Sequence, residues 1–399
     1  MKYIVLIGDG MADFPIKELD NRTILEVADI PNMTEIVKMG TIGRINTIPD
    51  GFSPASDVAN LTILGYDPAK YYCGRGPLEA ANMGIELKEN EVAFRCNLIT
   101  VEGESLVDYS AGHISSQEAS ELIALLNEQL SNNEFVKFYP GLSYRHLLVI
   151  KGPDTEELAK VKCTPPHDVI GQNILKNLPQ GKTSNFLIDL MERSREILSL
   201  HEINRVRIDL KENPANMIWP WGQGKAPSMP SFEEKYKISG SMISAVDLMN
   251  GLGRLIGLKV IKVPGATGYY DTNYEGKAQH AIDSLKKRDF VFVHVEAPDE
   301  AGHNGDILAK KAAIENFDKF IVKKALVYLK DNPDTRILIM PDHATPVEVR
   351  THTRDLVFFA MCGKGIEHGG FSMFNESEAL KSNRTINNGY ELMDDFIRA

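Results

Sequence analysis

Short and nearly continuous apolar runs alternate with helical patterns along this chain, and this alternation limits the possible folds more than any other feature. Helical patterns lie at 116–129, 184–198, 244–256, 276–287 and 307–329, and the clearest apolar runs lie at 3–7, 290–295, 336–340 and 356–361. Strands that are apolar on both faces are expected where helices cover both faces of a sheet. The pattern therefore predicts an α/β protein with a mostly parallel central sheet.

The middle of the chain has a different pattern. Runs at 92–100, 135–139 and 144–151 are typical of antiparallel strands around a helix that begins near Ser116, and Pro140-Gly141 and Gly152-Pro153 mark turns. We therefore expect a discontinuous core domain, 1–92 and 185–399, interrupted by a smaller α+β insert domain at 93–184.

Charge and cysteine usage exclude several classes of protein. The 399 residues include 44 Lys and Arg and 55 Asp and Glu, a net charge of −11, which argues against a nucleic-acid binder or a polybasic membrane-surface protein. No run approaches the roughly 20 apolar residues of a membrane-spanning helix. Four widely spaced cysteines form no metal or disulfide pattern, so we expect reduced thiols in a cytoplasmic protein. The negative net charge does not exclude an anionic substrate, provided that positively charged groups are concentrated around the site that binds it.

Acidic residues and histidines stand where the strongest predicted strands end. Asp9 follows the first run, Asp299 and His303 follow the second, Asp342 and His343 follow the third, and His352 precedes the fourth. Because ligands bind beyond the carboxyl ends of parallel strands, we expect these side chains to converge. Carboxylate oxygens and imidazole nitrogens suit divalent cations, and three Asp and three His suffice for two ions. A single group of this kind is more often a helix cap or a surface turn, and it is the coincidence of three groups at strand ends that indicates a site.

Ser56 is the candidate nucleophile. The pattern at 57–64 is helical and ends at Gly65, which places Ser56 at the helix N-cap. Simple capping is the alternative explanation, because serine is a preferred N-cap residue. Beside two cations, however, the same hydroxyl can be activated, and a helix N-terminus favours the anion that forms.

The chain carries a series of motifs in a specific order that resembles the cofactor-independent phosphoglycerate mutases. The resemblance spans nearly the whole chain and is strongest to the archaeal-type branch, within the alkaline phosphatase superfamily. The motifs that carry it are Gly8-Asp9-Gly10, Pro54-Ala55-Ser56-Asp57, Leu64-Gly65-Tyr66-Asp67-Pro68, Gly74-Arg75-Gly76-Pro77, Pro298-Asp299-Glu300-Ala301-Gly302-His303, Pro341-Asp342-His343 and Thr351-His352-Thr353.

This resemblance implies an alkaline-phosphatase-like core, a transiently phosphorylated Ser56 and two divalent metal ions. One ion would be bound by Asp9, Ser56, Asp342 and His343, and the other by Asp299, His303 and His352. In the family the ions are usually manganese, with magnesium, cobalt or zinc as variants. The implied reaction interconverts 3-phosphoglycerate and 2-phosphoglycerate without bisphosphoglycerate, in glycolysis and gluconeogenesis.

Some positions depart from the family pattern. Asn60 stands where archaeal-type mutases commonly have histidine, and Ala55 where they commonly have glycine. Together with Ala93-Phe94-Arg95-Cys96-Asn97 and Tyr109-Ser110-Ala111-Gly112-His113, these residues resemble a bacterial subgroup proposed to act as homoserine kinases in threonine biosynthesis. A phosphotransferase of that kind is the alternative function, and a phosphatase or another hydrolase of phosphate or sulfate esters is a third. A non-catalytic metal-binding protein of the same fold would be expected to lack Ser56 or a metal ligand, and all of them are present. Gly181-Lys182-Thr183 lacks the glycine and the preceding strand of a P-loop, which counts against an ATP site of that type.

The insert domain is expected to close over the site as a lid and to bind the substrate carboxylate. A small phosphorylated acid is the expected partner, and the sequence leaves the oligomeric state open. We interpret Trp219 and Trp221 as core or lid packing. Arginine suits bidentate contact with carboxylate or phosphate, although a surface salt bridge is the simpler interpretation of any single one. The substrate-binding candidates are Arg75, Arg95, His113, Arg145 and Lys277.

Overall fold

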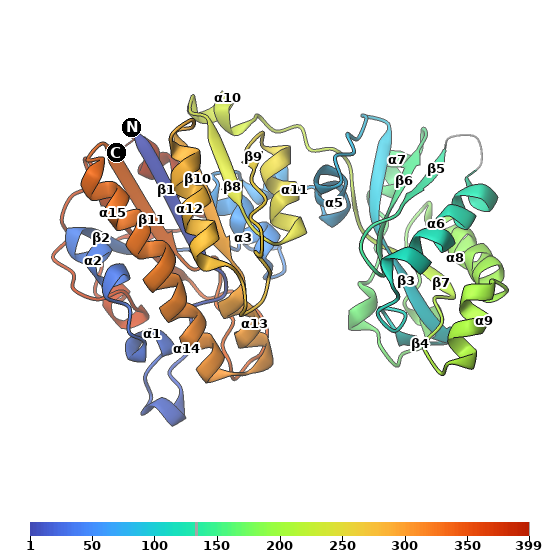
Figure 1. Cartoon of the computed structure of the whole chain (residues 1–399). Coiled ribbons are helices and arrows are strands. Elements are labelled where there is room, and N and C mark those ends of the chain that lie inside the picture. The colour runs from blue at the N-terminus through green and yellow to red at the C-terminus, as the bar shows by residue number, and fades with distance from the viewer. Residues whose placement is uncertain (132–134, 399) are drawn as a thin grey trace. The chain divides into compact units, whose positions relative to one another are not determined.

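The computed structural model describes residues 1–131 and 135–398, and it divides the chain into two compact units (Figure 1). The core unit comprises Met1–Tyr72 and Met229–Ala399, and the insert unit comprises Cys73–Ser228. Each unit has its own sheet.

The core unit is built on a sheet of eight strands in the order β13-β2-β12-β11-β1-β10-β8-β9. Its strands are β1 (Lys2–Gly8), β2 (Gly40–Ile45), β8 (Gly240–Ile243), β9 (Lys259–Val260), β10 (Phe290–Val295), β11 (Thr335–Met340), β12 (Val357–Gly363) and β13 (Thr385–Ile386). The central strands β11, β1, β10 and β8 are parallel neighbours, and β12 is antiparallel to both β11 and β2. The predicted α/β fold with a mostly parallel sheet is confirmed.

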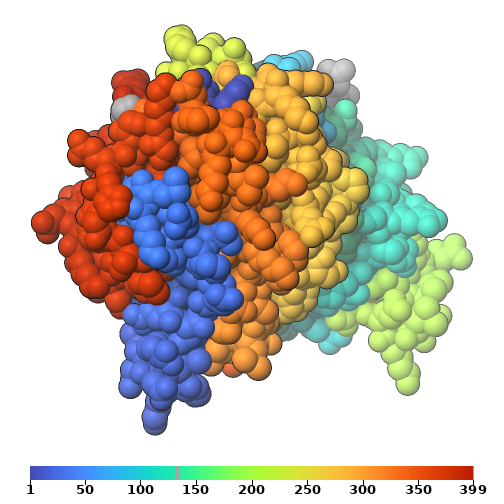
Figure 2. Space-filling model, turned by 60° about the vertical axis from the view of Figure 1, so that its left-hand side comes forward, coloured from blue at the N-terminus to red at the C-terminus, as the bar shows by residue number. Residues whose placement is uncertain are grey.

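Helices cover both faces of this sheet. In Figure 1, α2, α12 and α15 lie in front of it and α3 lies behind it. The helices of the core unit are α1 (Ile24–Val27), α2 (Pro31–Met39), α3 (Ser56–Ile63), α4 (Pro68–Tyr71), α10 (Phe232–Tyr236), α11 (Asp247–Leu255), α12 (Tyr274–Leu285), α13 (Ala297–Asn304), α14 (Ile307–Asn316), α15 (Lys323–Asp331), α16 (Glu376–Ala379) and α17 (Leu392–Arg398). Figure 2 shows the part of the chain that follows β1, in blue, on the surface between the orange helices and the red C-terminal segment.

The topology explains why the predicted site residues meet. The carboxyl ends of β1, β10 and β11 lie at one edge of the sheet because these strands are parallel neighbours. The antiparallel strand β12 begins at that same edge, so the segment before it also reaches the edge. The four segments that carry the Asp and His residues therefore lie together.

The insert unit has a five-stranded antiparallel sheet in the order β4-β3-β6-β5, with β7 paired to the other side of β3. Its strands are β3 (Glu91–Glu102), β4 (Ser105–Asp108), β5 (Val136–Tyr139), β6 (Arg145–Lys151) and β7 (Met217–Gly224), and its helices are α5 (Arg75–Asn82), α6 (Ser116–Leu130), α7 (Thr155–Leu158), α8 (Ser184–Ser199) and α9 (Glu202–Asp209). The predicted antiparallel strands are present, and Trp219 and Trp221 are buried in the apolar core of this unit, as expected from packing.

The insert unit is larger than the expected 93–184. It begins at Cys73 because α5 packs on β3 and β7, and it extends to Ser228 because β7 completes the sheet. The segment of β7 contains Pro220, Gly222 and Gly224, which weaken the sequence signal for a strand.

The long helix expected at 307–329 contains a π-helical segment, η4 (Phe317–Val322), between α14 and α15. The carboxylate of Asp318 in η4 accepts hydrogen bonds from the backbone N–H of Met33 (2.6 Å) and from Nδ2 of Asn32 (2.7 Å), at the start of α2. The wider π-helical turn thus occurs where Asp318 accepts hydrogen bonds from N–H groups at the start of α2 that have no partner within their own helix.

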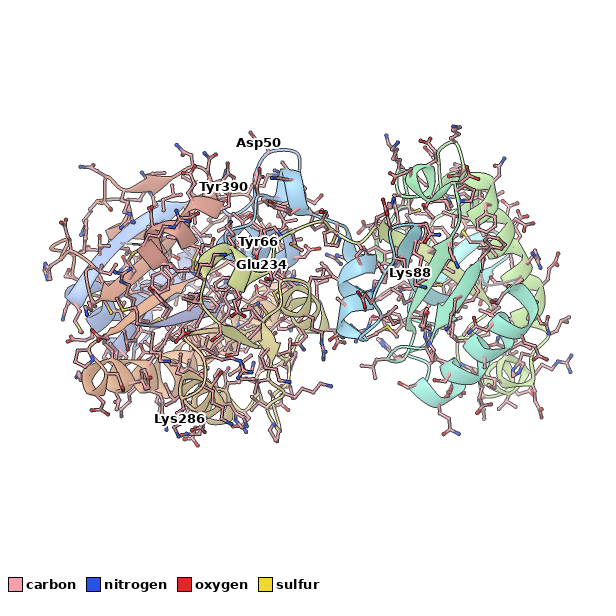
Figure 3. The ribbon with its side chains drawn as sticks, turned by 90° about the horizontal axis from the view of Figure 1, so that it is seen from above. Asp50, Tyr66, Lys88, Glu234, Lys286 and Tyr390 are labelled. Atoms are coloured by element: carbon pink, nitrogen blue, oxygen red, sulfur yellow. The ribbon has the colours of Figure 1, made fainter. Side chains whose placement is uncertain are left out.

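The two stretches of chain that form the core unit are joined by specific contacts. Tyr66 Oη donates a hydrogen bond to the backbone oxygen of Pro230 (3.1 Å), and Tyr66 and Glu234 are labelled close to each other in Figure 3. In the part of the chain that the structure describes, no helix is long and apolar enough to cross a membrane.

Candidate active site

Ser56 is the first residue of α3, and Ala55, in extended conformation, is the N-cap. The prediction that Ser56 is the N-cap was therefore wrong by one position. Because Ser56 is already helical, its hydroxyl does not cap α3, and its Oγ lies 3.1 Å from Nε2 of His343. The hydroxyl faces the group of Asp and His side chains, and simple capping does not explain it.

Asp9, Asp342 and His343 form a fully buried group at the ends of β1 and β11. Nε2 of His343 lies 3.4 Å from Oδ1 of Asp9 and 3.6 Å from Oδ2 of Asp342. The Asp342 carboxylate is held by the backbone N–H groups of Gly10 (3.1 Å) and His343 (2.9 Å). Both oxygens of Asp9 are buried and accept no hydrogen bond within residues 1–131 and 135–398, which leaves them available to a cation.

A second group joins Asp299 and His303 on α13 to His352 before β12. Nε2 of His303 and Nε2 of His352 lie 3.0 Å apart, and they lie 3.2 Å and 3.4 Å from the oxygens of Asp299. The Nδ1 atoms contact backbone oxygens instead, Arg350 O for His303 (3.0 Å) and Pro54 O for His352 (3.3 Å). A histidine that binds a metal through Nε2 usually fixes its ring in this way through the other nitrogen.

The electrostatics of these side chains favour a bound cation. Burial and the neighbouring carboxylates of Asp342, Asp299 and Glu296 raise the pKa of Asp9 well above its ordinary value. The hydrogen bond to Asp299 raises the pKa of His303 to about 9. Several carboxylates that repel one another in a buried place are stabilised by positive charge, and a divalent ion supplies more of it than a proton.

The structure adds three side chains that the sequence reasoning missed. His294 is fully buried, with Nε2 3.1 Å from Oδ2 of Asp9, and Glu296 lies on its other side, 3.9 Å from Nδ1. Asp9, His294 and Glu296 are close enough to form a further cation-binding group. Thr345, also buried, donates a hydrogen bond to Oδ1 of Asp299.

Two more residues support the group. Asn60, which was noted only as a departure from the family pattern, donates to Oδ2 of Asp342 (2.7 Å) and to the backbone oxygen of Ser56 (2.8 Å). Lys277 is fully buried on α12, and its Nζ donates to the backbone oxygen of His294 (3.2 Å). Burial lowers the pKa of Lys277 to about 8, although the nearby Glu296 opposes this shift.

The other four predicted substrate-binding residues gather within the insert unit. The guanidinium groups of Arg75 and Arg95 lie 5.4 Å and 5.1 Å from the ring centre of Trp221. Arg145 on β6 is paired with Asn97, two residues along β3 from Arg95, so Arg95 and Arg145 project from the same face of the sheet. Burial lowers the pKa of Arg95. The carboxylate of Glu79, whose Oε1 lies 3.9 Å from Nε of Arg95, opposes this shift, and the charges of Arg75 and Arg145 add to it.

A chain of aromatic rings connects His113 to this group. His113 packs against Tyr144 (5.9 Å between ring centres), Tyr144 against Tyr109 (5.6 Å), Tyr109 against His167 (6.2 Å) and His167 against Trp221 (5.4 Å). The sequence reasoning did not select Tyr109, Tyr144 or His167 as site residues. We call Arg75, Arg95, His113, Arg145, His167 and Trp221 the insert-unit basic cluster.

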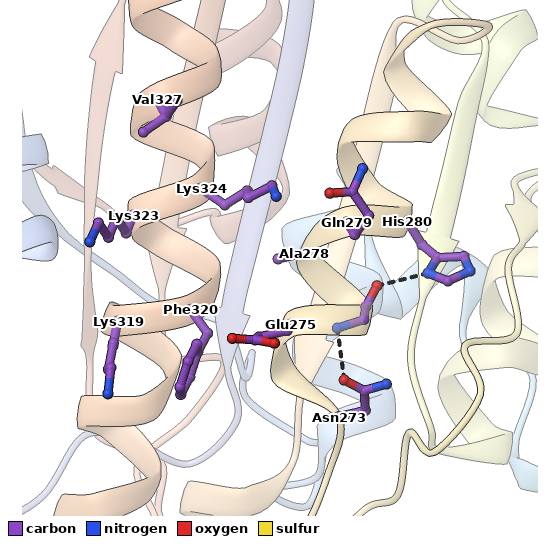
Figure 4. A pocket seen from close by; sticks show the side chains of 11 residues that line it. Asn273, Glu275, Ala278, Gln279, His280, Lys319, Phe320, Lys323, Lys324 and Val327 are labelled. Atoms are coloured by element: carbon purple, nitrogen blue, oxygen red, sulfur yellow. Dashed lines mark hydrogen bonds between the residues drawn. The ribbon is translucent and has the colours of Figure 1, made fainter.

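A large surface cavity lies away from these groups. Its volume is about 840 Å³, and it is lined by side chains of α12, η4 and α15, including Lys319, Lys323 and Lys324 (Figure 4). Its lining contains none of the predicted site residues.

Comparisons with known proteins identify the family. The family model described as 2,3-bisphosphoglycerate-independent phosphoglycerate mutase matches residues 38–204. Proteins with that name from Methanosarcina acetivorans and Methanosarcina barkeri are 56% identical over 362 residues (90% of each chain) and 52% identical over 405 residues (100% of each chain). A Geobacter sulfurreducens protein named as a probable member is 46% identical over 399 residues, 99% of each chain.

Solved structures agree with the relatives. A Pyrococcus horikoshii protein matches with a TM-score of 0.83 at 29% identity, over 100% of this chain and 96% of that one. The cofactor-independent phosphoglycerate mutase from Thermoplasma acidophilum matches with a TM-score of 0.70 at 29% identity, over 100% and 99%. The family expected from the motifs is confirmed: the chain belongs to the 2,3-bisphosphoglycerate-independent phosphoglycerate mutases.

Proposed function

We propose that this protein interconverts 3-phosphoglycerate and 2-phosphoglycerate without bisphosphoglycerate, as a step of glycolysis and gluconeogenesis. The observation that carries the proposal is the position of Ser56, whose Oγ lies 3.1 Å from Nε2 of His343 at the sheet edge where the Asp and His groups meet. The names of the relatives support a mutase rather than the homoserine-kinase-like alternative.

Two divalent cations, manganese first among them, belong to this proposal. Asp9, Asp342 and His343, with Ser56, would hold one ion, and Asp299, His303 and His352 would hold the other. The mixture of carboxylate oxygens and imidazole nitrogens fits Mn²⁺, and also Mg²⁺, Co²⁺ or Zn²⁺. The buried oxygens of Asp9 and the facing Nε2 atoms of His303 and His352 support this assignment. Bound cations would neutralise charge on the transferred group and lower the pKa of a serine hydroxyl.

The phosphoryl group moves in two displacements. Ser56 Oγ forms a bond to phosphorus as the bond to the 3-oxygen of glycerate breaks. The glycerate then turns, and its 2-hydroxyl oxygen forms a bond to phosphorus as the bond to Ser56 Oγ breaks. The N-terminus of α3 stabilises negative charge on Ser56 and on its phosphate. Such a reaction depends mainly on positioning and on electrostatic stabilisation.

We assign the substrate carboxylate to the insert-unit basic cluster, with Arg75, Arg95, Arg145 and His113 as its contacts, and a phosphate oxygen to Lys277. Planar guanidinium groups suit a carboxylate. The stacking of Arg75 and Arg95 on Trp221 supports this assignment, because it limits their freedom before binding.

The test uses the full chain, stripped of metal and reloaded with Mn²⁺. It is given 3-phosphoglycerate without bisphosphoglycerate, and enolase reports the 2-phosphoglycerate that forms. Turnover is expected. The absence of turnover, with phosphohomoserine formed from homoserine and ATP, would replace the mutase by the kinase-like alternative.

The role of Ser56 is tested by Ser56→Ala, with Ser53→Ala as a matched control on the same segment, where the side chain is exposed. Ser56→Ala is expected to lower kcat by at least about 10³-fold, as removal of a covalent nucleophile does, while Mn²⁺ still binds. Activity of Ser56→Ala above a few per cent of wild type would remove Ser56 from this role.

A further inference from the structure

Thr345 lies between the two groups of cation ligands. It follows His343 by two positions in the loop after β11, and it is fully buried. Its Oγ1 contacts Oδ1 of Asp299, in one group, and lies 3.2 Å from Nδ1 of His343, in the other. One hydroxyl thus touches both groups.

The available protons fix the direction of these two hydrogen bonds. A threonine hydroxyl has one proton to donate, and a carboxylate can only accept. The hydroxyl proton therefore goes to Asp299, and the remaining contact requires Nδ1 of His343 to donate to Oγ1. A neutral His343 with its proton on Nδ1 presents an unprotonated Nε2 to Ser56 and Asp9.

The surrounding backbone holds Thr345 in this position. A Cβ on Gly10, which has a φ of +60°, would come within 2.5 Å of both Thr345 Oγ1 and Asp299 Oδ1. A Cβ on Gly302 in α13 would come within 2.4 Å of the Thr345 backbone oxygen. That oxygen also accepts a hydrogen bond from Nζ of the fully buried Lys310 (2.8 Å).

We propose that Thr345 is a positioning residue that couples the two cation sites. Its hydroxyl holds His343 in the tautomer that directs Nε2 toward Asp9 and Ser56, and it holds the carboxylate of Asp299 toward His303 and His352. The inference rests on the two-cation site proposed above, but it concerns a side chain that is not itself assigned as a ligand.

The first experiment measures Mn²⁺ binding to the metal-stripped full chain by titration calorimetry. Thr345→Val keeps the branched shape and removes the hydroxyl, whereas Thr345→Ser keeps the hydroxyl. We expect Thr345→Val to weaken both Mn²⁺ sites by about 10- to 100-fold, the usual effect of losing a partner behind a metal ligand. Thr345→Ser is expected to restore most of the affinity.

Thr62→Val is the matched control. Thr62 is equally buried in the same unit, and its hydroxyl donates to the backbone oxygen of Val58 within α3 (2.9 Å). We expect it to bind Mn²⁺ as the wild type does. Wild-type affinity at either site in Thr345→Val, or an equal loss in Thr345→Ser, would overturn the proposal. A wild type that binds no Mn²⁺ would instead defeat the two-cation site itself.

The second experiment needs no metal, and its readout is made on the wild type. In the metal-free wild type, ¹⁵N NMR of the imidazole rings reports the tautomer of His343, whose signals are assigned by their loss in His343→Gln. We expect a protonated Nδ1 and an unprotonated Nε2. A His343 ring protonated on Nε2 alone would contradict the proposal even if the wild type bound Mn²⁺ normally.

Discussion

Asn60 connects the nucleophile to a candidate metal ligand through a single side-chain amide. Its Nδ2 donates both to Oδ2 of Asp342 and to the backbone oxygen of Ser56. Asn60→Ala would leave the buried Asp342 carboxylate without this donor, so we expect Mn²⁺ affinity to fall by about 10-fold or more. Calorimetric titration measures the change.

The control for this variant is Asn332→Ala, at an exposed amide after α15, which should bind Mn²⁺ as the wild type does. If Asn60→Ala also kept wild-type affinity, Asn60 would only support α3.

His146 on β6 should make the protein sensitive to acid. It is buried, its Nδ1 accepts a hydrogen bond from the backbone N–H of Gly141 (3.1 Å), and burial lowers its pKa to about 3. The unfolded chain has the ordinary value near 6.5 and takes up the proton first as the pH falls. The neutral ring therefore contributes stability that is present above about pH 6.5 and is lost toward pH 3, at about 1.4 kcal/mol per pH unit.

The variant His146→Asn keeps an acceptor for the N–H of Gly141 but has no titrating ring. When the pH falls from 6.5 to 4.5, we expect its free energy of unfolding to decrease by about 2 to 3 kcal/mol less than that of the wild type. Urea unfolding at each pH gives the two free energies. Parallel curves for the two proteins would show that His146 does not titrate on unfolding.

At the scale of elements, the sequence predicted those features that depend on local pattern and on general topology. The strands that became β1, β10, β11 and β12 are apolar runs, and parallel pairing alone brings their ends together. This is why Asp9, Asp299 and Asp342 could be selected. Long helices such as α6 and α8 were found from their apolar periodicity.

Other features depend on tertiary contacts that no local pattern shows. His294 lies within an apolar run and resembles an ordinary core histidine until β1 places Asp9 beside it. Thr345 belongs to no sequence motif that would indicate a use for its hydroxyl. The hydroxyl reaches Asp299 only because α13 packs beside the loop that carries Thr345. The strand β7 was missed because its proline and glycines disfavour a strand in the sequence pattern. Pairing with β3 and the burial of Trp219 and Trp221 stabilise the strand in the folded protein.

Asp318, in the π-helical segment η4, is expected to stabilise the folded protein. Asp318 accepts three hydrogen bonds from Asn32 and Met33 at the start of α2. Asp318→Ala is expected to lower the free energy of unfolding by about 1 to 3 kcal/mol, the effect of leaving buried donors without an acceptor. The exposed Asp331→Ala, in α15, is the control and should change it by no more than about 0.5 kcal/mol.

Urea denaturation gives both values, and Mn²⁺ affinity should be the same in both variants because Asp318 contacts α2 rather than the cation ligands. If Asp318→Ala had the same free energy of unfolding as the wild type, water would satisfy the hydrogen-bond donors at the start of α2 as well as Asp318 does.

At the scale of the whole molecule, the insert unit has the features of an autonomous domain. It has its own apolar core, which includes Phe94, Leu122, Phe138 and Trp219. The two ends of the unit run side by side. Gly74 lies so close to the backbone of Gln223, and Gly224 so close to the backbone of Cys73, that neither position has room for a Cβ. We expect the fragment 73–228 to fold alone and to unfold cooperatively in urea. A gradual loss of circular dichroism without a transition would show that it depends on the core unit.

The division of charges between the two units leads to a prediction for the core unit alone. The net charge of −11 is an average over the chain. The candidate cation ligands Asp9, Asp299 and Asp342 all lie in the core unit, whereas Arg75 and Arg95 lie in the insert unit. A chain in which residues 1–72 are joined to residues 229–399 by a flexible linker of about eight Gly and Ser residues keeps the first set and lacks the second.

We expect this shortened chain to bind Mn²⁺ within about 10-fold of the full-length affinity, because the hydrogen bonds that hold the ligands are internal to the core unit. Interconversion of the phosphoglycerates should fall by at least about 10³-fold, because the arginines assigned to the substrate carboxylate are missing. Calorimetry and the enolase assay measure the two effects on one sample. Normal Mn²⁺ binding with more than a few per cent of the mutase activity would show that the core unit binds the substrate without the basic cluster.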